Sequence, residues 1–543
     1  MSGERLLMSG DDAVALAALH AGVRLGTGYP GTPSTEILET FDRLGGRAQW
    51  SPNEKVALEV GMGTAFAGAR TLVTMKHVGL NVAADPLFTA AYTDIEGGLV
   101  LVSADDPGMA SSQNEQDNRH YARAAALPML EPIDSQQAYD FTWLGLEISE
   151  RWKIPVILRL TTRVCHSKTA VVPRDSADEM AEPRFERDIP ARVMIPAYAK
   201  PAHHRLRQKL AEIADWNEQD GPNRLDEGKA ELGIVATGIA AVHAREAAPE
   251  ARQLTIGLTY PLPLDRIRAF AEGVERLVVV EEGDPVLVDA LRAAGIPAEG
   301  KPEMYRFGEL NVERVRRILA GDTSPEPIPP KGKPPELCQG CSHRTVFQAL
   351  RDLDCIVAGD IGCYTLGVLP PFSAMDTCVC MGASIGVGLG MRHVLPEDQA
   401  RRVVSVIGDS TFVHSGITGI AEMVYNPPAT GHLVLILDNG TTAMTGQQEH
   451  PGTGRLLDHS PTGKISFEAL AESMGVQNVH VVESSAGEEG LKTLIAELLA
   501  KPETSLVVTR QPCVLAAPKI RFYEKAAAEQ LAAEKGCAAE PAG

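Results

Sequence analysis

Basic residues are scarce in this sequence relative to acidic ones. Lysine and arginine number 51 against 71 aspartates and glutamates, which gives a formal net charge of −20 at pH 7. An acidic surface of this size repels phosphate backbones, because both carry negative charge. We therefore expect no nucleic acid among the partners of this protein.

Long apolar segments are also missing. The best candidate for a membrane span, residues 377–391, is rich in glycine and shorter than the roughly 20 residues that a spanning helix needs. The first residues, Met1 to Arg5, contain no apolar core of an export signal. We predict a cytoplasmic protein that does not enter a membrane.

Cysteine is sparse, with nine residues in 543. In a chain expected in the cytoplasm, such cysteines serve as metal ligands or buried thiols more often than as a disulfide framework. The pair Cys338 and Cys341 has the spacing of a ligand pair, while Cys363 and Cys513 each follow a predicted strand. Four thiolates suit a [4Fe-4S] cluster and a tetrahedral zinc ion equally well.

The pattern of apolar residues predicts a multidomain α/β fold. Short β-branched runs alternate with longer stretches rich in alanine and leucine, which is typical of parallel sheets with crossover helices. Residues 55–69 and 521–535 are predicted helices. The predicted strands are residues 70–75, 98–104, 154–160, 232–237, 253–258, 276–282, 355–360, 403–407, 433–438 and 505–509.

Two segments interrupt this alternation and suggest domain boundaries. A polar stretch at 173–222 places one boundary near residue 195. A proline-rich segment at 325–335 predicts a stiff linker, because proline fits neither a helix interior nor a central strand. The predicted domains are residues 1–195, 196–325 and 326–515, followed by a helical tail at 516–543.

Glycines recur at every second position in residues 382–390. This run does not follow a strand at the offset of a dinucleotide-binding motif, and such a motif alone is weak evidence. We interpret it as a helix that packs closely on its neighbours.

A carboxylate and an amide follow two predicted strands of the third domain. Gly408, Asp409 and Ser410 come after one strand, and Asn439 comes after the next, 30 residues beyond Asp409. Parallel strands of an open sheet place ligands at their carboxyl ends. Together with the backbone carbonyl of Thr441, these oxygens suit Mg²⁺ bound to phosphates. The alternative is a pair of ordinary strand-end turns.

The Gly-Asp motif followed by asparagine resembles the metal motif of thiamine diphosphate enzymes. Such enzymes need a second carboxylate, on another domain, beside the aminopyrimidine ring. Glu54, at the start of the predicted helix 55–69, is the candidate for this role. Glu59 is the rival, and we expect it to be structural.

Further motifs extend this resemblance over residues 10–515. The chain is similar to the large (alpha) subunits of indolepyruvate ferredoxin oxidoreductases, in the 2-oxoacid:ferredoxin oxidoreductase superfamily. The segments that carry the resemblance are residues 28–34, 53–65, 75–81, 111–117, 338–343 and 359–364, with the Asp409 and Asn439 pair.

The resemblance implies two thiamine-diphosphate-binding-type parallel-sheet domains flanking a transketolase-C-terminal-like α/β domain. It implies that Glu54 activates the cofactor and that Asp409, Asn439 and Thr441 hold Mg²⁺. Thr32 would bind the substrate, with Lys76 and His77 as weaker candidates for its carboxylate. Further cofactor contacts are expected from Tyr29, Pro30, Gly31, Gly408, Ser410 and Cys363.

In the same family, cysteines placed like Cys338, Cys341, Cys363 and Cys513 hold a [4Fe-4S] cluster, which favours iron–sulfur over zinc here. The implied reaction is oxidative decarboxylation of an aryl 2-oxoacid to its acyl-coenzyme A. A smaller beta subunit would complete an α2β2 assembly.

One departure from the family leaves the electron acceptor open. Alpha subunits of this family usually end in a ferredoxin-like module, whereas residues 516–543 contain only Cys537 and are predicted helical. The acceptor is therefore ferredoxin or another protein. Two further functions remain as alternatives: a non-redox thiamine diphosphate decarboxylase or carboligase, and a noncatalytic assembly subunit stabilised by zinc.

Overall fold

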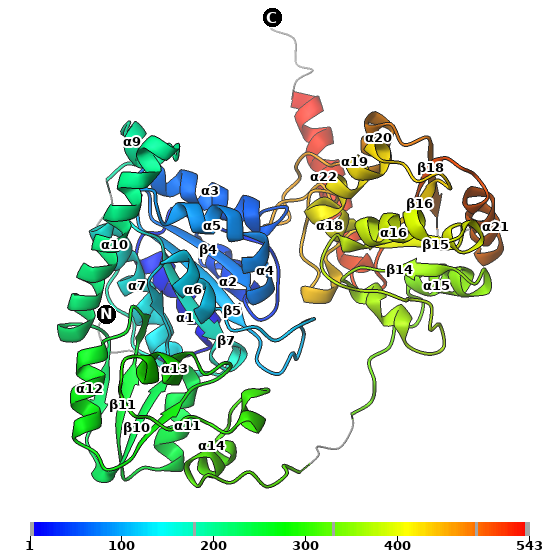
Figure 1. The fold of residues 1–543 in the computed structure, drawn as a ribbon. Helices are drawn as coiled ribbons and strands as arrows, with labels where there is room; N and C mark the ends of the chain where they lie inside the picture. Colours follow the sequence, from blue (N-terminus) through cyan, green and yellow to red (C-terminus); the bar gives the residue numbers. More distant parts are fainter. Residues whose placement is uncertain (1–4, 178–180, 328–331, 484–486, 538–543) are drawn as a thin grey trace, which may run out of the picture. The chain divides into compact units, whose positions relative to one another are not determined.

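The structure is a computed structural model that describes residues 5–177, 181–327, 332–483 and 487–537 (Figure 1). The chain divides into two compact units, Met1–Ile328 and Pro329–Gly543. The centre of the predicted linker, residues 328–331, lies outside the described residues. Within the described part of the chain, every helix is too short or too polar to cross a membrane.

A seven-stranded sheet forms the core of the first unit. Its strand order is β12-β6-β7-β5-β4-β2-β3, and all neighbouring strands are parallel except β12 and β6. The strands are β2 (Leu25–Gly28), β3 (Ala48–Trp50), β4 (Thr71–Lys76), β5 (Leu99–Asp105), β6 (Met129–Leu130), β7 (Val156–Thr161) and β12 (Leu258–Tyr260). Every residue of β4, β5 and β7 is buried, as expected for parallel strands covered by helices on both faces.

The predicted helix at 55–69 is α3, and further helices accompany this sheet. Within this set, α1 packs against α2 and α7, whereas α3 packs against α4 and α5 (Figure 1). The helices are α1 (Gly10–His20), α2 (Thr35–Arg43), α3 (Glu54–Phe66), α4 (His77–Val82), α5 (Ala84–Ala90), α6 (Arg119–Ala125), α7 (Ser135–Trp152), α8 (Thr162–His166), α9 (Ile189–Arg192) and α10 (Pro196–Gln219). A small antiparallel pair, β1 (Leu6–Met8) and β8 (Thr169–Val171), completes this part.

A second sheet in the first unit has the order β13-β10-β11-β9, with β9 antiparallel to β11. Its strands are β9 (Arg224–Asp226), β10 (Lys229–Thr237), β11 (Ala251–Ile256) and β13 (Leu277–Val280). Its helices are α11 (Gly238–Ala247), α12 (Leu264–Glu272), α13 (Val286–Ala293), η1 (Glu303–Arg306) and α14 (Val312–Leu319).

Two elements connect this second sheet to the first one. The predicted strand 253–258 is two strands, because the chain leaves β11 at Ile256 and pairs β12 with β6 of the larger sheet. The predicted boundary near residue 195 falls just before α10. The buried residues Leu206, Leu210 and Ile213 of that helix belong to the core of the larger sheet. The division at residue 195 stays a prediction.

The second unit contains five parallel strands in the order β14-β15-β16-β18-β17. These strands are β14 (Ile356–Ala358), β15 (Val403–Gly408), β16 (His432–Asp438), β17 (Asn478–Glu483) and β18 (Thr504–Arg510). Four of them were predicted from the sequence. The fifth, β17, was missed because it is a partly exposed edge strand without a continuous apolar run.

Helices cover both faces of this sheet and form the tail. They are α15 (Ser342–Asp352), η2 (Cys363–Val368), α16 (Ala383–Val394), α17 (Glu397–Ala400), α18 (Asp409–Thr411), η3 (Phe412–Gly416), α19 (Ile417–Tyr425), η4 (Ala443–Thr445), α20 (Phe467–Met474), α21 (Glu488–Leu499) and α22 (Ala517–Cys537). The glycine run becomes α16. An added Cβ at Gly388 would collide with Ser405, but at Gly386 and Gly390 it would meet nothing within 4 Å in the described part of the chain. The expectation of close packing is therefore wrong for Gly386 and Gly390.

The architecture agrees with the predicted α/β fold class, which has several domains built on parallel sheets. In each unit the candidate side chains follow the carboxyl ends of neighbouring parallel strands, where open sheets bind ligands. Each unit therefore contributes its own group of candidate residues.

Candidate functional site

Glu54 is the first residue of α3 and is buried, with 5% of its surface exposed. Asn53 caps the helix, since its Oδ1 accepts a hydrogen bond from the Val56 N–H at 2.9 Å. The carboxyl group lies against Gly79 of α4, where an added Cβ would come within 2.6 Å of Glu54 Oε1. Only glycine at position 79 leaves room for this carboxyl group.

Glu59 has a different environment. It pairs with Lys55 at 2.9 Å, and both side chains are nearly half exposed. This ion pair on the surface of α3 agrees with the structural role expected for Glu59.

The turn that carries Thr32 connects β2 to α2. Tyr29, Pro30 and Gly31 are buried in it, whereas Thr32 is half-buried. The Gly31 N–H donates to Thr35 Oγ1 at 3.0 Å, and a side chain at position 31 would come within 3.0 Å of Lys76 Cβ. The turn therefore packs directly on the end of β4.

Lys76 and His77 are covered by the loop 106–118. Lys76 Nζ donates to the backbone oxygen of Ser111 at 2.7 Å and to Ser111 Oγ at 3.2 Å. Burial lowers the pKa of Lys76 to about 8, and the charge of Asp106 opposes this shift. His77 is fully buried, and its Nε2 lies 3.2 Å from both Asn114 O and Asn114 Oδ1.

A buried ionic network fixes the far end of this loop. Arg119 contacts Asp117 and Glu281, each at 2.5 Å, and all three side chains are buried. The Asp284 N–H donates to Asp117 Oδ2 at 3.0 Å. Glu281 and Asp284 lie beyond β13, so the second sheet helps to place the loop over Lys76 and His77. Sequence reasoning missed this network, because its two sides are 162 residues apart in the chain.

Asp409 and Asn439 meet at the carboxyl edge of the sheet in the second unit. They follow the neighbouring parallel strands β15 and β16. Asp409 Oδ2 accepts hydrogen bonds from the backbone N–H groups of Asn439 at 3.2 Å and Gly440 at 2.8 Å. Both side chains are buried, with 2% and 7% of their surfaces exposed.

His450 is a second-unit residue that sequence reasoning missed. Its Nε2 lies 3.3 Å from Asp409 Oδ2, and its Nδ1 accepts from the Gly452 N–H at 3.2 Å. This arrangement leaves the ring proton on Nε2, facing the carboxylate. Burial raises the pKa of Asp409, but His450 and the backbone N–H groups of Ser410 and Gly440 outweigh it, so the pKa lies below its usual value.

Ser410 and Thr441 lie on either side of this carboxylate edge. Ser410 Oγ accepts from Thr442 Oγ1 at 2.9 Å, and the Thr441 N–H donates to Asn439 Oδ1 at 3.1 Å. The oxygens of Asp409 and Asn439 are hard donors, which suit Mg²⁺. The donor set therefore fits the metal that the sequence motif predicts.

The four cysteines line one cavity of about 90 Å³ in the second unit. Burial raises the pKa of the Cys363 thiol to about 11, and the nearby thiols Cys513, Cys341 and Cys338 add to this shift. The Cys513 N–H donates to the backbone oxygen of Asn439 at 2.9 Å. The fold thus brings the thiols together from separate segments of the sequence.

Asn439 and His343 also line this cavity, so the cavity and the Asp409 edge share residues. His343 Nε2 lies 3.5 Å from Asn439 Nδ2. Burial lowers the pKa of His343 to about 4, although the charge of Asp409 opposes this. His343 is therefore neutral near pH 7. Its place in the motif 338–343 was noted in the sequence, but its contact with Asn439 was not foreseen.

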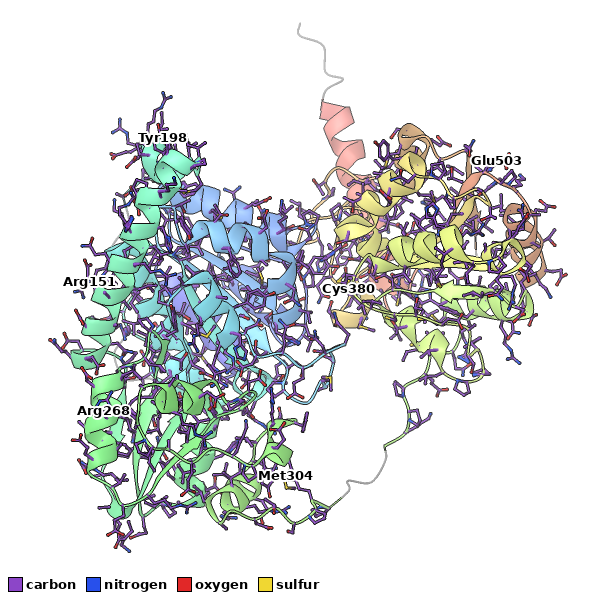
Figure 2. The ribbon with its side chains drawn as sticks, viewed as in Figure 1. Arg151, Tyr198, Arg268, Met304, Cys380 and Glu503 are labelled. Atoms are coloured by element: carbon purple, nitrogen blue, oxygen red, sulfur yellow. The ribbon has the colours of Figure 1, made fainter. Side chains whose placement is uncertain are left out.

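Cys378 and Cys380 do not line the cavity. Cys380, which is labelled in Figure 2, is exposed in the turn before α16.

Glu54 and the pair Asp409 and Asn439 fall within segments that match known protein families. Residues 16–217 match the thiamine-diphosphate-binding domain of pyruvate flavodoxin/ferredoxin oxidoreductases, and this segment contains Glu54. Residues 360–509 match the C-terminal binding domain of thiamine pyrophosphate enzymes, and this segment contains Asp409 and Asn439.

Relatives with established names align over nearly the whole of this chain. The indolepyruvate oxidoreductase subunit IorA of Methanothermobacter thermautotrophicus is 38% identical over 96% of this chain and 88% of that protein. IorA of Archaeoglobus fulgidus is 37% identical over the same shares. IorA of Thermococcus kodakarensis is 37% identical over 94% of this chain and 86% of that protein.

One of the solved structures that the comparison found is the 2-oxoglutarate:ferredoxin oxidoreductase of Magnetococcus marinus. It is 18% identical, covers 59% of this chain and 65% of that chain, and has a TM-score of 0.49.

Proposed function

Because the chain belongs to the IorA subunits of indolepyruvate oxidoreductases, within the 2-oxoacid:ferredoxin oxidoreductase superfamily, we propose that it oxidatively decarboxylates aryl 2-oxoacids. The substrates are of the indolepyruvate or phenylpyruvate type, and coenzyme A receives the acyl group. Electrons leave through a [4Fe-4S] cluster to ferredoxin or another acceptor protein.

The observation that carries this proposal is the cavity that joins the four cysteines to Asn439 and His343. An electron acceptor held there would share residues with the proposed diphosphate and Mg²⁺ site. Because the two sites share residues, electrons would travel only a short distance from the cofactor to the cluster. A purely structural metal would not need to lie beside the cofactor.

The family supports a cluster over zinc. The four cysteines line one cavity, and four thiolates can hold either a tetrahedral zinc ion or a [4Fe-4S] cluster. Because the chain belongs to the IorA subunits, we favour the [4Fe-4S] cluster.

The residues of the second unit would hold the diphosphate end of the cofactor. Asp409, Asn439 and the backbone carbonyl of Thr441 supply oxygens to Mg²⁺, and Gly408 and Ser410 flank them. When bound, thiamine diphosphate supplies the electron sink for decarboxylation. His450 keeps Asp409 ionised, which the metal requires.

The residues of the first unit would hold the aminopyrimidine end and the substrate. Glu54, which is buried, would share a proton with the ring when the cofactor is bound. Tyr29, Pro30 and Gly31 shape the turn beside it. Thr32 donates a hydrogen bond to the substrate, and Lys76 and His77 receive its carboxylate.

A smaller beta subunit of the indolepyruvate oxidoreductase type is the proposed partner, in an α2β2 assembly. We expect this chain to need that partner for turnover, as the family resemblance implies.

The test is the metal content of the anaerobically purified complex with its beta subunit. We expect about four irons and four sulfides per chain, and reduction of an added acceptor when indolepyruvate and coenzyme A are present. Cys513→Ser should lose the iron and the acceptor reduction but keep thiamine diphosphate. Cys355→Ser is the matched control, because this thiol does not line the cavity.

Two outcomes would overturn the proposal. Zinc in place of iron, together with failure to bind thiamine diphosphate, would indicate an assembly subunit. Release of free aldehyde in the absence of any acceptor would indicate a non-redox decarboxylase.

A further inference from the structure

A second group of potential metal ligands lies in the first unit, outside the proposed site. Asp11 in α1, Glu36 in α2 and His166 in α8 converge from three helices. One carboxylate oxygen of each acid and one ring nitrogen of His166 all lie within 4.8 Å of one another. The proposed function uses none of these residues.

Asp11 is the unusual member of the group. Its surface is 1% exposed, and neither of its carboxylate oxygens has a hydrogen-bond partner that meets normal geometry. A buried carboxylate without a partner is costly, so such groups are normally paired or bound to a metal. Burial raises the pKa of Asp11 well above its usual value. The thiol of Cys165, a weak donor, opposes this shift, whereas the charges of Glu36 and Asp12 add to it.

An acid in the first turn of a helix often serves only to interact with the helix dipole. Asp12, the other acid in the first turn of α1, has partners, because it accepts hydrogen bonds from Ser9 Oγ and Thr40 Oγ1. Asp11, the residue before it, instead points toward Glu36 and His166. The helix terminus therefore does not account for its position.

Glu36 and His166 are both exposed, so the group opens to solvent on one side. Imidazole nitrogen and carboxylate oxygen are common ligands of zinc, and sites with three protein ligands leave a position for water. Two carboxylates and one imidazole also neutralise a divalent cation. The types of ligand and the solvent exposure of the group both suit a metal ion that exchanges with solution.

We propose that Asp11, Glu36 and His166 bind one divalent transition-metal ion of the zinc class. The ion joins the starts of α1 and α2 to the end of α8. Because α2 follows directly after the turn that carries Thr32, the ion also holds the base of that turn.

The test is a zinc titration of the full chain in complex with its beta subunit, in excess Mg²⁺. Wild type is compared with Glu36→Gln and His166→Ala, whose side chains are exposed and whose loss should not unfold the protein. Asp11→Asn, which keeps the shape of the side chain, is a third variant. His204→Ala, which removes an exposed histidine of α10, is the matched control.

We expect wild type and His204→Ala to bind one more zinc ion per chain than the three variants, or to bind it at least tenfold more tightly. Zinc should raise the unfolding temperature of the first two proteins only. Equal zinc stoichiometry, affinity and thermal shift in all five proteins would overturn the proposal. Any zinc bound by the cysteines would be present in all five proteins. The difference in zinc binding between wild type and the three variants therefore does not depend on the proposed function.

Discussion

Glu54 occupies a position that local sequence and long-range packing determine together. Asn53 starts the helix, so Glu54 falls in the first turn, where a carboxylate is favoured by the helix dipole. Gly79 then leaves space for the carboxyl group against α4. A carboxyl group at this buried position can share a proton with the ring of a bound cofactor.

Replacement of Glu54 by glutamine should lower turnover by roughly 10²–10⁴-fold, the usual contribution of a general acid or base. Binding of thiamine diphosphate should change little, because the amide keeps the size of the side chain. Steady-state assays and cofactor titration would measure both effects. Glu59→Gln, on the same helix but exposed, should leave both unchanged, and normal turnover in Glu54→Gln would remove Glu54 from the mechanism.

From the pKa of Lys76 we predict that kcat/KM depends on pH. Burial lowers its pKa to about 8, so the ammonium form dominates below that pH and the neutral amine above it. If the ammonium binds the 2-oxoacid carboxylate, kcat/KM should fall as pH rises through about 8. A pH profile of kcat/KM would show this fall as its alkaline limb. The profile of Lys76→Arg, whose side chain stays charged, should lack that limb. An identical limb in both proteins would exclude Lys76 as its source.

At the scale of the element, α16 shows how one helix contains glycines of two kinds. An added Cβ at Gly388 would come within 2.8 Å of the His432 ring on β16 and would also crowd Ser405 on β15. At Gly386 an added Cβ would meet nothing within 4 Å in the described part of the chain. The first glycine is required for helix–sheet packing, whereas the second only weakens the helix.

The two glycines should therefore respond in opposite directions to alanine. Gly388→Ala should lower the free energy of unfolding by about 1–3 kcal/mol through overpacking. Gly386→Ala should raise it by up to about 1 kcal/mol, because alanine is the better helix former. Urea denaturation of both variants would measure the difference. Equal effects would mean that α16 does not pack on the sheet as described.

At the scale of the whole molecule, the chain has separate hydrophobic cores in its two units. All four tryptophans, at positions 50, 143, 152 and 216, belong to the first unit. Units with independent cores need not unfold together. Tryptophan fluorescence and far-ultraviolet circular dichroism therefore report on different parts of the molecule.

We expect the unfolding curves from these two probes not to coincide. Gly388→Ala, in the second unit, should shift part of the dichroism transition and leave the fluorescence transition in place. The comparison needs only the isolated chain and both probes on one denaturant series. A fluorescence transition that moves with the dichroism would show that the two units unfold as one.

Much of the fold was predictable because the buried strands of parallel sheets are mainly apolar. The runs that became β4, β5, β7, β15, β16 and β18 are buried on both faces, and this makes them visible in the sequence. β17 was not predictable in this way, because an edge strand exposes part of its length. The break between β11 and β12 was also not predictable from the sequence, because β12 is positioned by pairing with β6, which is distant in the chain.

The sequence by itself determined which side chains lie at strand ends, because the order of residues decides which of them come directly after each strand. Asp409 and Asn439 were found in this way, whereas Lys76 and the turn around Thr32 became candidates through the family resemblance. Only the tertiary structure brought His450 to Asp409, His343 to Asn439, and Asp117 with Arg119 to Glu281. The same holds for Asp11, Glu36 and His166. Such contacts join segments far apart in the chain, and their distances depend on how sheets and helices pack, which local sequence does not specify.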